Sequence, residues 1–112
     1  MFAMRKERMQ QEAEPAEAYL SCIDRALEVF GSSVKSVVYF RFQEEHGLKR
    51  EEIGSKPELF VQTIDKFFGV GSHLVKSSIE KEIRSALAPY DLGHSDTASI
   101  LRKGYEHFQR AK

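Results

Sequence analysis

The residues best suited to chemistry in this sequence are its histidines, its single cysteine and one glycine-rich turn. The four histidines are His46, His73, His94 and His107. Zinc ligands on one helix face lie three or four residues apart, and no two of these histidines have that spacing. The sequence therefore predicts no metal site, and it predicts surface or helix-capping positions for the histidines. One arrangement stays open, in which folding brings His94, His107 and Asp96 together; metal analysis of the purified protein would reveal it.

The glycine-rich turn is Gly69-Val70-Gly71, which resembles half of a dinucleotide-binding loop. Such a loop needs a preceding strand and a third glycine, whereas here a predicted helix precedes the turn. The chain also has no Gly-Lys-Ser/Thr phosphate loop, no serine nucleophile elbow and no pair of isolated carboxylates in apolar surroundings. We therefore expect no bound cofactor, no catalytic residues and no enzymatic activity.

Cys22 lies at helical spacing from Tyr19, Ile23 and Ala26, so we expect a small buried apolar residue rather than a reactive thiol. A lone cysteine cannot form an intramolecular disulfide, and the N-terminus shows no basic segment followed by a continuous apolar one. No apolar run approaches the roughly 20 residues that span a bilayer. These features predict a cytoplasmic protein without membrane contact.

The composition is that of one globular domain with balanced charge. The chain has 112 residues, with 17 Lys and Arg against 17 Asp and Glu, so its formal net charge is zero. Such a balance argues against a generic polyanion binder, although a local basic patch is compatible with it. Residues 1–16 lack a sustained apolar stripe and are expected to be disordered or a frayed helix, and residues 17–112 to form a single helical domain.

Two Phe-Gly steps, Phe30-Gly31 and Phe68-Gly69, each end an apolar helix and lead through a short polar turn into another helix. This pattern is that of an αα-hairpin, and it occurs twice. A further helix is predicted to begin near Asp96, after Pro89 has closed the fourth. The predicted fold class is therefore all-α, a compact bundle of four to five helices built from two αα-hairpins, with the fifth helix at its periphery.

Polar residues mark the predicted helix starts. Ser32 or Ser33 can cap the second helix, and Ser95 or Asp96 can cap the last. In Ser55-Lys56-Pro57-Glu58, a serine N-cap, a proline in the first turn and a glutamate three residues after the serine are typical of a capping box. These signals predict where the second, third and last helices begin.

The second helix carries more apolar residues than one buried stripe can hold. Its residues Val37 to Phe42 could form a strand on propensity alone, but the caps and the polar continuation from Arg41 to Glu45 favour a helix. Tyr39 and Phe40 point away from the apolar stripe of this helix. They predict either a second packed helix or an interface with a protein partner, which could be another copy of the chain.

The segment from Ile64 to Ser78 has the geometry of a helix-turn-helix, because a short glycine-containing turn joins its two helices. The match is partial, since Asp65 occupies a position where the motif needs a small residue. Under this alternative, Lys76, Lys81 and Arg84 would contact DNA. An ordinary packed helical hairpin explains the same residues, and we favour it.

A series of helix ends and packing residues runs from about Ala26 to Leu87. Its members are Ala26-Leu27, Val29-Phe30-Gly31, Val34, Val38-Tyr39-Phe40, Gly47-Leu48, Glu51-Glu52-Ile53, Pro57-Glu58-Leu59-Phe60, Phe68-Gly69-Val70-Gly71 and Ile79-Glu80-Lys81-Glu82-Ile83. Their order resembles the Nitrosopumilus-type output domain, a family of small helical domains in archaeal signalling proteins. The resemblance implies an intracellular regulatory or interaction role, and it carries over no catalytic residue set.

The sequence thus predicts a non-enzymatic regulatory module that acts through protein–protein contacts, with signal-transduction output as its context. Its partner would be another protein or a second copy in a homodimer, and Tyr39 and Phe40 are the candidate interface residues. The alternative is a helix-turn-helix-like DNA-binding transcriptional regulator.

Overall fold

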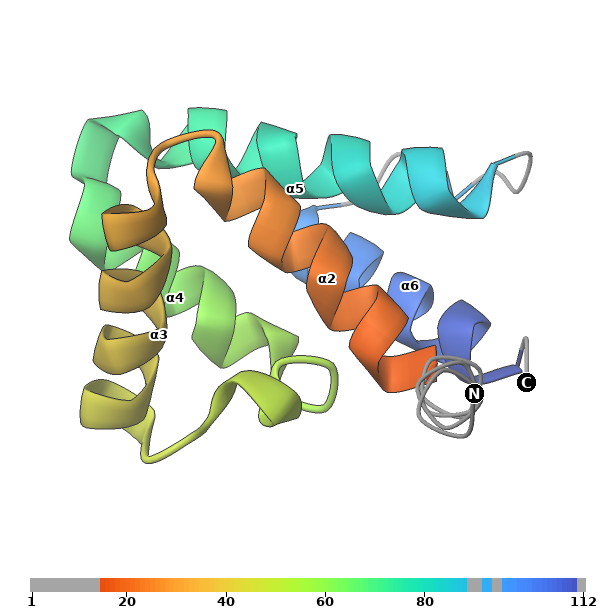
Figure 1. Ribbon diagram of the computed structural model, residues 1–112, viewed down its shortest axis with the longest axis horizontal. Helices are drawn as coiled ribbons and strands as arrows, with labels where there is room; N and C mark the ends of the chain where they lie inside the picture. Colours follow the sequence, from red (N-terminus) through yellow and green to blue (C-terminus); the bar gives the residue numbers. More distant parts are fainter. Residues whose placement is uncertain (1–14, 89–91, 94–95, 111–112) are drawn as a thin grey trace, which may run out of the picture.

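The computed structural model describes residues 15–88, 92–93 and 96–110 (Figure 1). Its α-helices are α2 (Pro15–Glu28), α3 (Ser32–His46), α4 (Pro57–Phe68), α5 (Ser72–Leu87) and α6 (Thr97–Arg110), and its 3-10 turns are η1 (Arg50–Glu52) and η2 (Gly69–Gly71). These described residues contain no strand, so the predicted all-α class is confirmed and residues 37–42 are helical. Of the segment 1–16, residues 1–14 lie outside the described part, and residues 15 and 16 begin α2.

The two predicted αα-hairpins are both present. Residues 29–31 join α2 to α3, and η2 joins α4 to α5. In Figure 1, α2 crosses the middle of the molecule, with α3 at one end and α5 along the upper edge. α2 packs against α3, α5 and α6, and α4 packs against the same three helices. The core lies between these elements.

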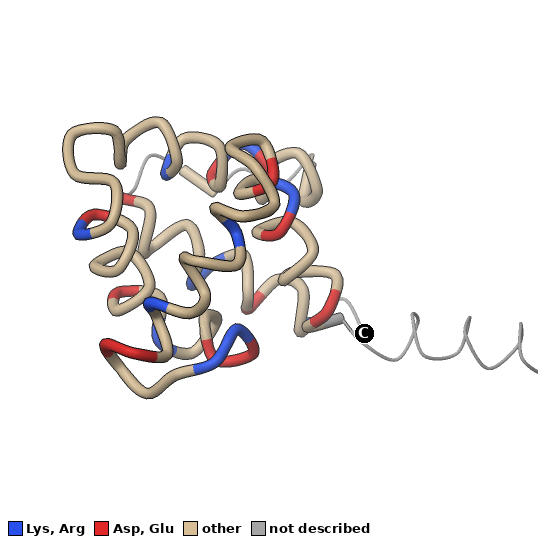
Figure 2. The backbone as a smooth tube through the Cα atoms, turned by 60° about the vertical axis from the view of Figure 1, so that its left-hand side comes forward, with Lys and Arg blue, Asp and Glu red and all other residues tan. Residues whose placement is uncertain are grey.

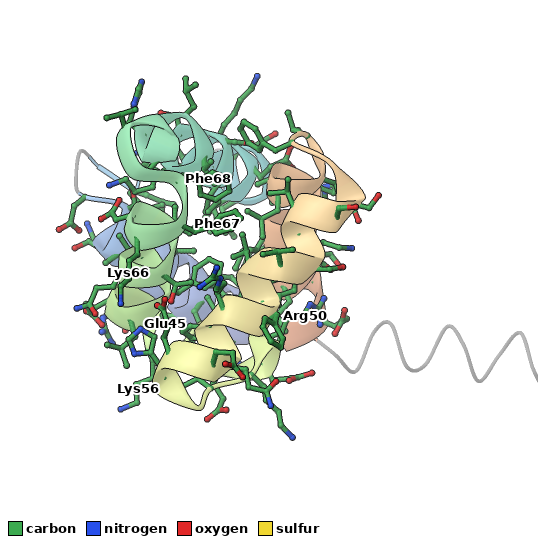
Figure 3. All side chains as sticks on the ribbon, turned by 90° about the vertical axis from the view of Figure 1, so that its left-hand side faces the viewer. Glu45, Arg50, Lys56, Lys66, Phe67 and Phe68 are labelled. Atoms are coloured by element: carbon green, nitrogen blue, oxygen red, sulfur yellow. The ribbon has the colours of Figure 1, made fainter. Side chains whose placement is uncertain are left out.

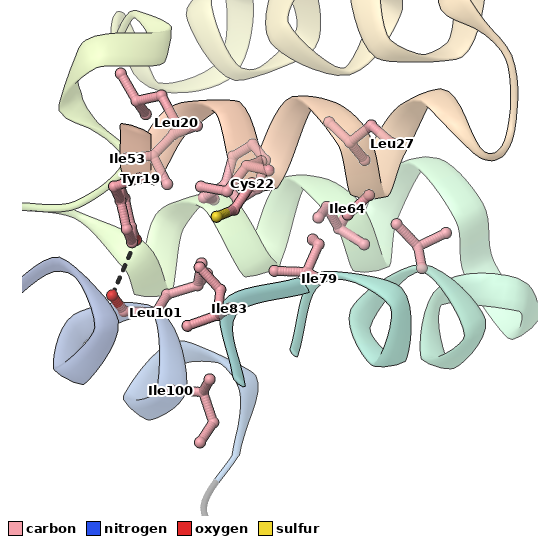
Figure 4. Packing of buried hydrophobic residues seen from close by; sticks show 14 of the residues in the cluster. Tyr19, Leu20, Cys22, Leu27, Ile53, Ile64, Ile79, Ile83, Ile100 and Leu101 are labelled. Carbon is pink, nitrogen blue, oxygen red and sulfur yellow. Dashed lines mark hydrogen bonds between the residues drawn. The ribbon is translucent and has the colours of Figure 1, made fainter. Parts of the chain in front are cut away.

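Apolar residues spaced three or four apart give these helices their buried faces. The pattern is simplest in α5, where Val75, Ile79, Ile83 and Leu87 are all buried. The buried face of α2 consists of Tyr19, Leu20, Cys22, Ile23, Ala26 and Leu27. Figure 4 shows how side chains from α2, α5 and α6 meet in this cluster. Cys22 is among them, so its predicted burial is confirmed.

Two polar residues interrupt the apolar side of α5, and both contact α2. The hydroxyl of Ser78 donates a hydrogen bond of 3.0 Å to the backbone carbonyl of Ala26. The carboxylate of Glu82 accepts a hydrogen bond of 3.1 Å from Nε of Arg25. Both polar groups are therefore satisfied where the two hairpins cross, which fixes the position of α5 against α2.

The last helix, α6, belongs to the core, so the predicted peripheral position is wrong. Ile100 and Leu101 are fully buried. The Tyr19 hydroxyl donates a buried hydrogen bond of 2.9 Å to the Leu101 carbonyl (Figure 4). The rings of Tyr105 and Phe108 meet the Tyr19 ring edge-on, at centroid distances of 5.3 and 5.8 Å. These aromatic contacts join the first and last described helices, which local periodicity does not predict.

The predicted serine cap of α3 is wrong. The helix begins at Ser32 itself, so Gly31 occupies the N-cap position with a φ of 115° and no side chain caps the helix. Ser33 lies inside the first turn. A positive φ of this size is easily adopted by glycine alone, which explains why the tight turn after α2 contains one.

The predicted capping box of α4 is also wrong, although the proline in the first turn is confirmed by Pro57. The hydroxyl of Ser55 donates to the carbonyl of Glu52 at 3.1 Å, so it turns back along the chain. The Glu58 carboxylate accepts a hydrogen bond of 2.7 Å from Arg102 on α6. Lys56 occupies the N-cap position and Pro57 begins the helix, so neither Ser55 nor Glu58 stands where a capping box needs it.

The start of α6 is as predicted, and a glycine ends α3. Gly47, with a φ of 67°, ends α3 in the left-handed conformation. Asp96 caps α6, because its carboxylate accepts a hydrogen bond of 2.9 Å from the backbone N–H of Ser99. Ser95, the other candidate cap, lies outside the described residues.

Candidate protein-interaction surface

One end of the molecule exposes large apolar side chains. The exposed residues are Val29, Val37, Phe40, Phe67, Val70 and Leu74. They come from the α2–α3 turn, α3, the end of α4, η2 and the start of α5, which lie together on the left in Figure 1. We call this set of six residues the apolar end. Exposure reaches 60% at Phe40 and 98% at Val70, so these side chains are directly available to a partner.

Aromatic contacts hold the segments of the apolar end together. The rings of Phe30 and Phe68 lie 6.4 Å apart between centroids, which joins the α2–α3 turn to the end of α4. The Phe67 ring meets Phe68 edge-on at 4.8 Å. The guanidinium of Arg41 lies over the Phe67 ring, 5.9 Å from its centroid, and so joins α3 to α4. These contacts hold the α2–α3 turn, α3 and the end of α4 together, and Figure 3 shows Phe67 and Phe68 at this end of the molecule.

An open hollow of about 260 Å³ lies between α3 and α4, next to the apolar end. Its lining residues are Arg41, Glu45, Lys66 and Phe67. Nζ of Lys66 is 3.8 Å from the Glu45 carboxylate, and the Lys66 side chain is 74% exposed, so this pair is weak. Nε2 of His46 lies 4.0 Å from the same carboxylate and is buried without a hydrogen-bond partner. The hollow therefore presents two cations and one carboxylate beside an aromatic ring.

The two predicted interface residues, Tyr39 and Phe40, have different surroundings. Phe40 belongs to the apolar end. Tyr39 is half-buried, with its ring 6.3 Å from that of Phe60, and its hydroxyl donates a hydrogen bond of 2.5 Å to the Asp24 carboxylate. Burial, and after it this hydrogen bond, raises the pKa of Tyr39 above its ordinary value. Tyr39 is therefore occupied within the fold, and Phe40 is available outside it.

An arginine that sequence reasoning did not single out binds the same carboxylate. Nη2 of Arg50, in η1, lies 2.7 Å from one oxygen of Asp24 and 2.8 Å from a Glu17 oxygen. Burial alone would raise the pKa of the Asp24 carboxyl, but hydrogen bonds from Arg50 and Tyr39 outweigh it and hold that pKa below 3.8. This network fixes η1 and α3 against α2. The residues of this network are far apart in the sequence, so no local sequence pattern predicts it.

The three candidate DNA contacts do not form a free basic face. Nζ of Lys76 is 2.8 Å from a carboxylate oxygen of Asp65, and this contact lowers the pKa of Asp65. The guanidinium of Arg84 donates a hydrogen bond of 2.6 Å to the carbonyl of Gly93. Lys81 is exposed. Figure 2 shows basic positions interspersed with acidic ones over the described backbone.

The described residues bring together no group of three or more His, Cys, Asp or Glu side chains that could hold a metal ion. His94 lies outside them, so its arrangement with His107 and Asp96 is not described. Burial raises the pKa of the Cys22 thiol, which keeps it protonated and unreactive at neutral pH. Among the described helices, none is long and apolar enough to cross a membrane.

Comparisons of the chain with protein-family models, with curated proteins and with solved structures found no match. In structural terms, the protein is an all-α bundle of two hairpins with the last helix packed against them, and one end of the bundle exposes apolar side chains. The family resemblance described above stays a prediction.

Proposed function

We propose that this protein is a non-enzymatic interaction module that binds another protein through the apolar end. The observation that carries the proposal is that the large exposed apolar residues of the described part of the chain all come from elements at one end of the molecule. Scattered single apolar residues are normal on a protein surface, whereas a contiguous patch is typical of an interaction site. The remaining large apolar residues of the described helices form one buried core or pack against it.

The composition of the apolar end supports the same function. Interface centres are enriched in aromatic residues and arginine, and the apolar end presents Phe40 and Phe67 with Arg41 beside the Phe67 ring. The supporting helices are held by a continuous core, so the surface is presented in one arrangement and little ordering entropy is lost on binding. The sequence resemblance supports a signalling output context, and the free buried Cys22 supports a cytoplasmic setting.

The test is affinity capture from an extract of the source cells, with bound proteins measured by quantitative mass spectrometry. Wild type is compared with Phe40→Ser, which removes an exposed ring of the apolar end, and with Glu106→Ser, which alters an exposed residue of α6. We expect a partner that wild type and Glu106→Ser retain and that Phe40→Ser loses by about tenfold or more. Equal capture by all three proteins would contradict the proposal.

A further inference from the structure

We propose that the partner segment recognised by the apolar end carries an acidic side chain between apolar ones, and that its carboxylate lies in the hollow between Arg41 and Lys66. This inference rests on the proposed function and specifies the chemistry of the partner. The apolar neighbours of the acidic residue would cover Phe40 and Val37, which lie within one helical turn of Arg41 on α3.

Arg41 is the first reason for an acidic partner. Three other arginines of the described helices and turns pair with carboxylates: Arg25 with Glu82, Arg50 with Asp24 and Glu17, and Arg102 with Glu58. Arg41 has no carboxylate within ion-pair distance among the described residues, and its guanidinium lies over the Phe67 ring. A guanidinium held against an aromatic face keeps its planar donor fork free for a carboxylate.

The charges around the hollow are the second reason. Two cations, Arg41 and Lys66, face one carboxylate, Glu45, so the lining is positive overall. Glu45 is 21% exposed and also faces His46, whereas Lys66 is 74% exposed and 3.8 Å away, so its ammonium can turn to an incoming anion.

The neighbouring carboxylates leave this positive lining in place. Glu44 is exposed on α3 but is not among the residues that line the hollow. On α4, Asp65 is already paired with Lys76 at 2.8 Å. A carboxylate therefore complements the hollow, and a basic side chain would be repelled.

The size of the hollow favours one side chain of a larger partner over a free small molecule. Pockets for drug-sized ligands hold about 300 to 1,000 Å³, and this hollow of about 260 Å³ falls below that range. It also opens directly onto the apolar end, because Phe67 belongs to both. A nucleic acid phosphate could meet the two cations but has no aliphatic side chains to cover Val37 and Phe40. An acidic and apolar protein segment meets both requirements.

The experiment is selection of a random-sequence peptide library, displayed on phage, against folded full-length protein. Five baits are used in parallel: wild type, Arg41→Glu, Lys66→Glu, Phe40→Ser, which removes an exposed ring of the apolar end, and Lys81→Glu, which reverses an exposed cation of α5 away from the hollow. Circular dichroism first establishes that each bait is folded, and sedimentation establishes its oligomeric state. Selected peptides are then synthesised with each Glu or Asp changed to Gln or Asn, and the affinities of both forms are measured.

We expect wild type and Lys81→Glu to select peptides with Asp or Glu next to Leu or aromatic residues. Arg41→Glu and Lys66→Glu should lose the acidic preference, and the amide-substituted peptides should bind wild type about tenfold more weakly or worse. Apolar peptides without acidic residues that still require Phe40 would overturn this inference and leave the proposed function intact. Binders indifferent to Phe40→Ser would contradict both. A wild-type dimer that Phe40→Ser dissociates would identify a second copy as the occupant and would overturn the acidic segment.

Discussion

Tyr39 and Phe40 are adjacent in the sequence, yet one supports the fold and the other faces outward. Successive residues of an α-helix point about 100° apart, so neighbours on the edge of a buried face separate in this way. The Tyr39 hydroxyl reaches Asp24 at 2.5 Å, whereas the Phe40 side chain is 60% exposed. We therefore expect single substitutions at these two positions to separate an effect on stability from an effect on the proposed binding.

We expect Tyr39→Phe to lower the free energy of unfolding by about 1 to 2 kcal/mol, because Asp24 loses a donor to its charged carboxylate. Phe40→Ser should change it by no more than about 0.5 kcal/mol, as is usual for an exposed residue. Urea denaturation followed by circular dichroism measures both. The opposite ranking, with Phe40→Ser the more destabilising variant, would mean that Phe40 is covered in the folded protein.

Gly104 lets α6 approach α5 and α2 closely. A Cβ at this position would lie 2.7 Å from Cγ2 of Ile83 and 3.6 Å from Cε1 of Tyr19. We expect Gly104→Ala to destabilise the protein by about 1 kcal/mol net, because overpacking at about 1 to 3 kcal/mol outweighs a helix-propensity gain of about 1 kcal/mol.

Gly71→Ala is the matched control for Gly104→Ala, since no atom lies within 4 Å of a Cβ built there. The backbone at Gly71 has a φ of −85°, which alanine adopts without strain. The Gly71→Ala substitution should leave the free energy of unfolding unchanged or raise it by up to about 1 kcal/mol. Thermal melts of the two variants with wild type make the comparison, and equal loss in both would contradict the close approach at Gly104.

Among the elements, α2, α3 and η1 are joined by a network of polar side chains as well as by the core. Arg50 binds Asp24 and Glu17 on α2, and Tyr39 on α3 binds the same Asp24. The Asp24 and Arg50 side chains are 21% and 22% exposed, so solvent screens this network only in part. The three elements are thus linked through the Asp24 carboxylate, which titrates in acid.

This network predicts a specific acid dependence of stability. The pKa of Asp24 is lower in the folded protein than its ordinary value of 3.8, so the unfolded chain binds a proton more readily. The resulting stabilisation is complete well above pH 4 and is lost as pH falls through and below that value. We expect Arg50→Gln to reduce the free energy of unfolding at pH 7 and to flatten its decline in acid.

Urea midpoints of wild type and Arg50→Gln between neutral pH and about pH 2.5 measure this effect. Other carboxyls with lowered pKa values, such as Asp65, are common to both proteins, so the difference between the curves reports on the Arg50 network. Parallel curves would show that Arg50 does not stabilise the charged form of Asp24.

At the scale of the whole molecule, charge bears on the DNA-binding alternative. The full sequence has no net charge, and basic and acidic positions are interspersed over the described residues (Figure 2). Nucleic acid binding needs several cations free to contact phosphates. Of the three candidates, Lys76 is paired with Asp65 and Arg84 with a backbone carbonyl. A duplex would have to break these contacts before it gained any of its own.

We therefore expect no salt-dependent binding of a labelled random-sequence duplex in fluorescence anisotropy, even at low salt. Lys76→Glu with Lys81→Glu should leave the anisotropy unchanged. Binding that weakens steeply with salt and is lost in this double variant would instead support a DNA-binding regulator, because phosphate contacts release counterions.

Much of the fold could be predicted from local patterns. The two hairpins and the faces of α2 and α5 follow from apolar spacing and from Gly31 and Gly69, because periodicity and chain reversal act over a few residues. The capping box at Ser55 is absent because α4 begins one residue later than the pattern predicts, with Lys56 as its N-cap; Ser55 turns back to Glu52, and Glu58 binds Arg102 from a helix far along the chain. Of the six residues of the apolar end, Phe40 was predicted from its surplus apolar area, whereas Phe67 and the neighbouring Arg41 were not singled out.

The sequence alone is sufficient for the all-α class, the helix order and the burial of Cys22, since these depend on which residues are apolar and how they are spaced. The docking of α6 on Tyr19, the different surroundings of Tyr39 and Phe40, and the lack of an acidic partner for Arg41 among the described residues depend on distant elements. Such contacts exist only when helices meet at particular angles and distances, which no local pattern specifies.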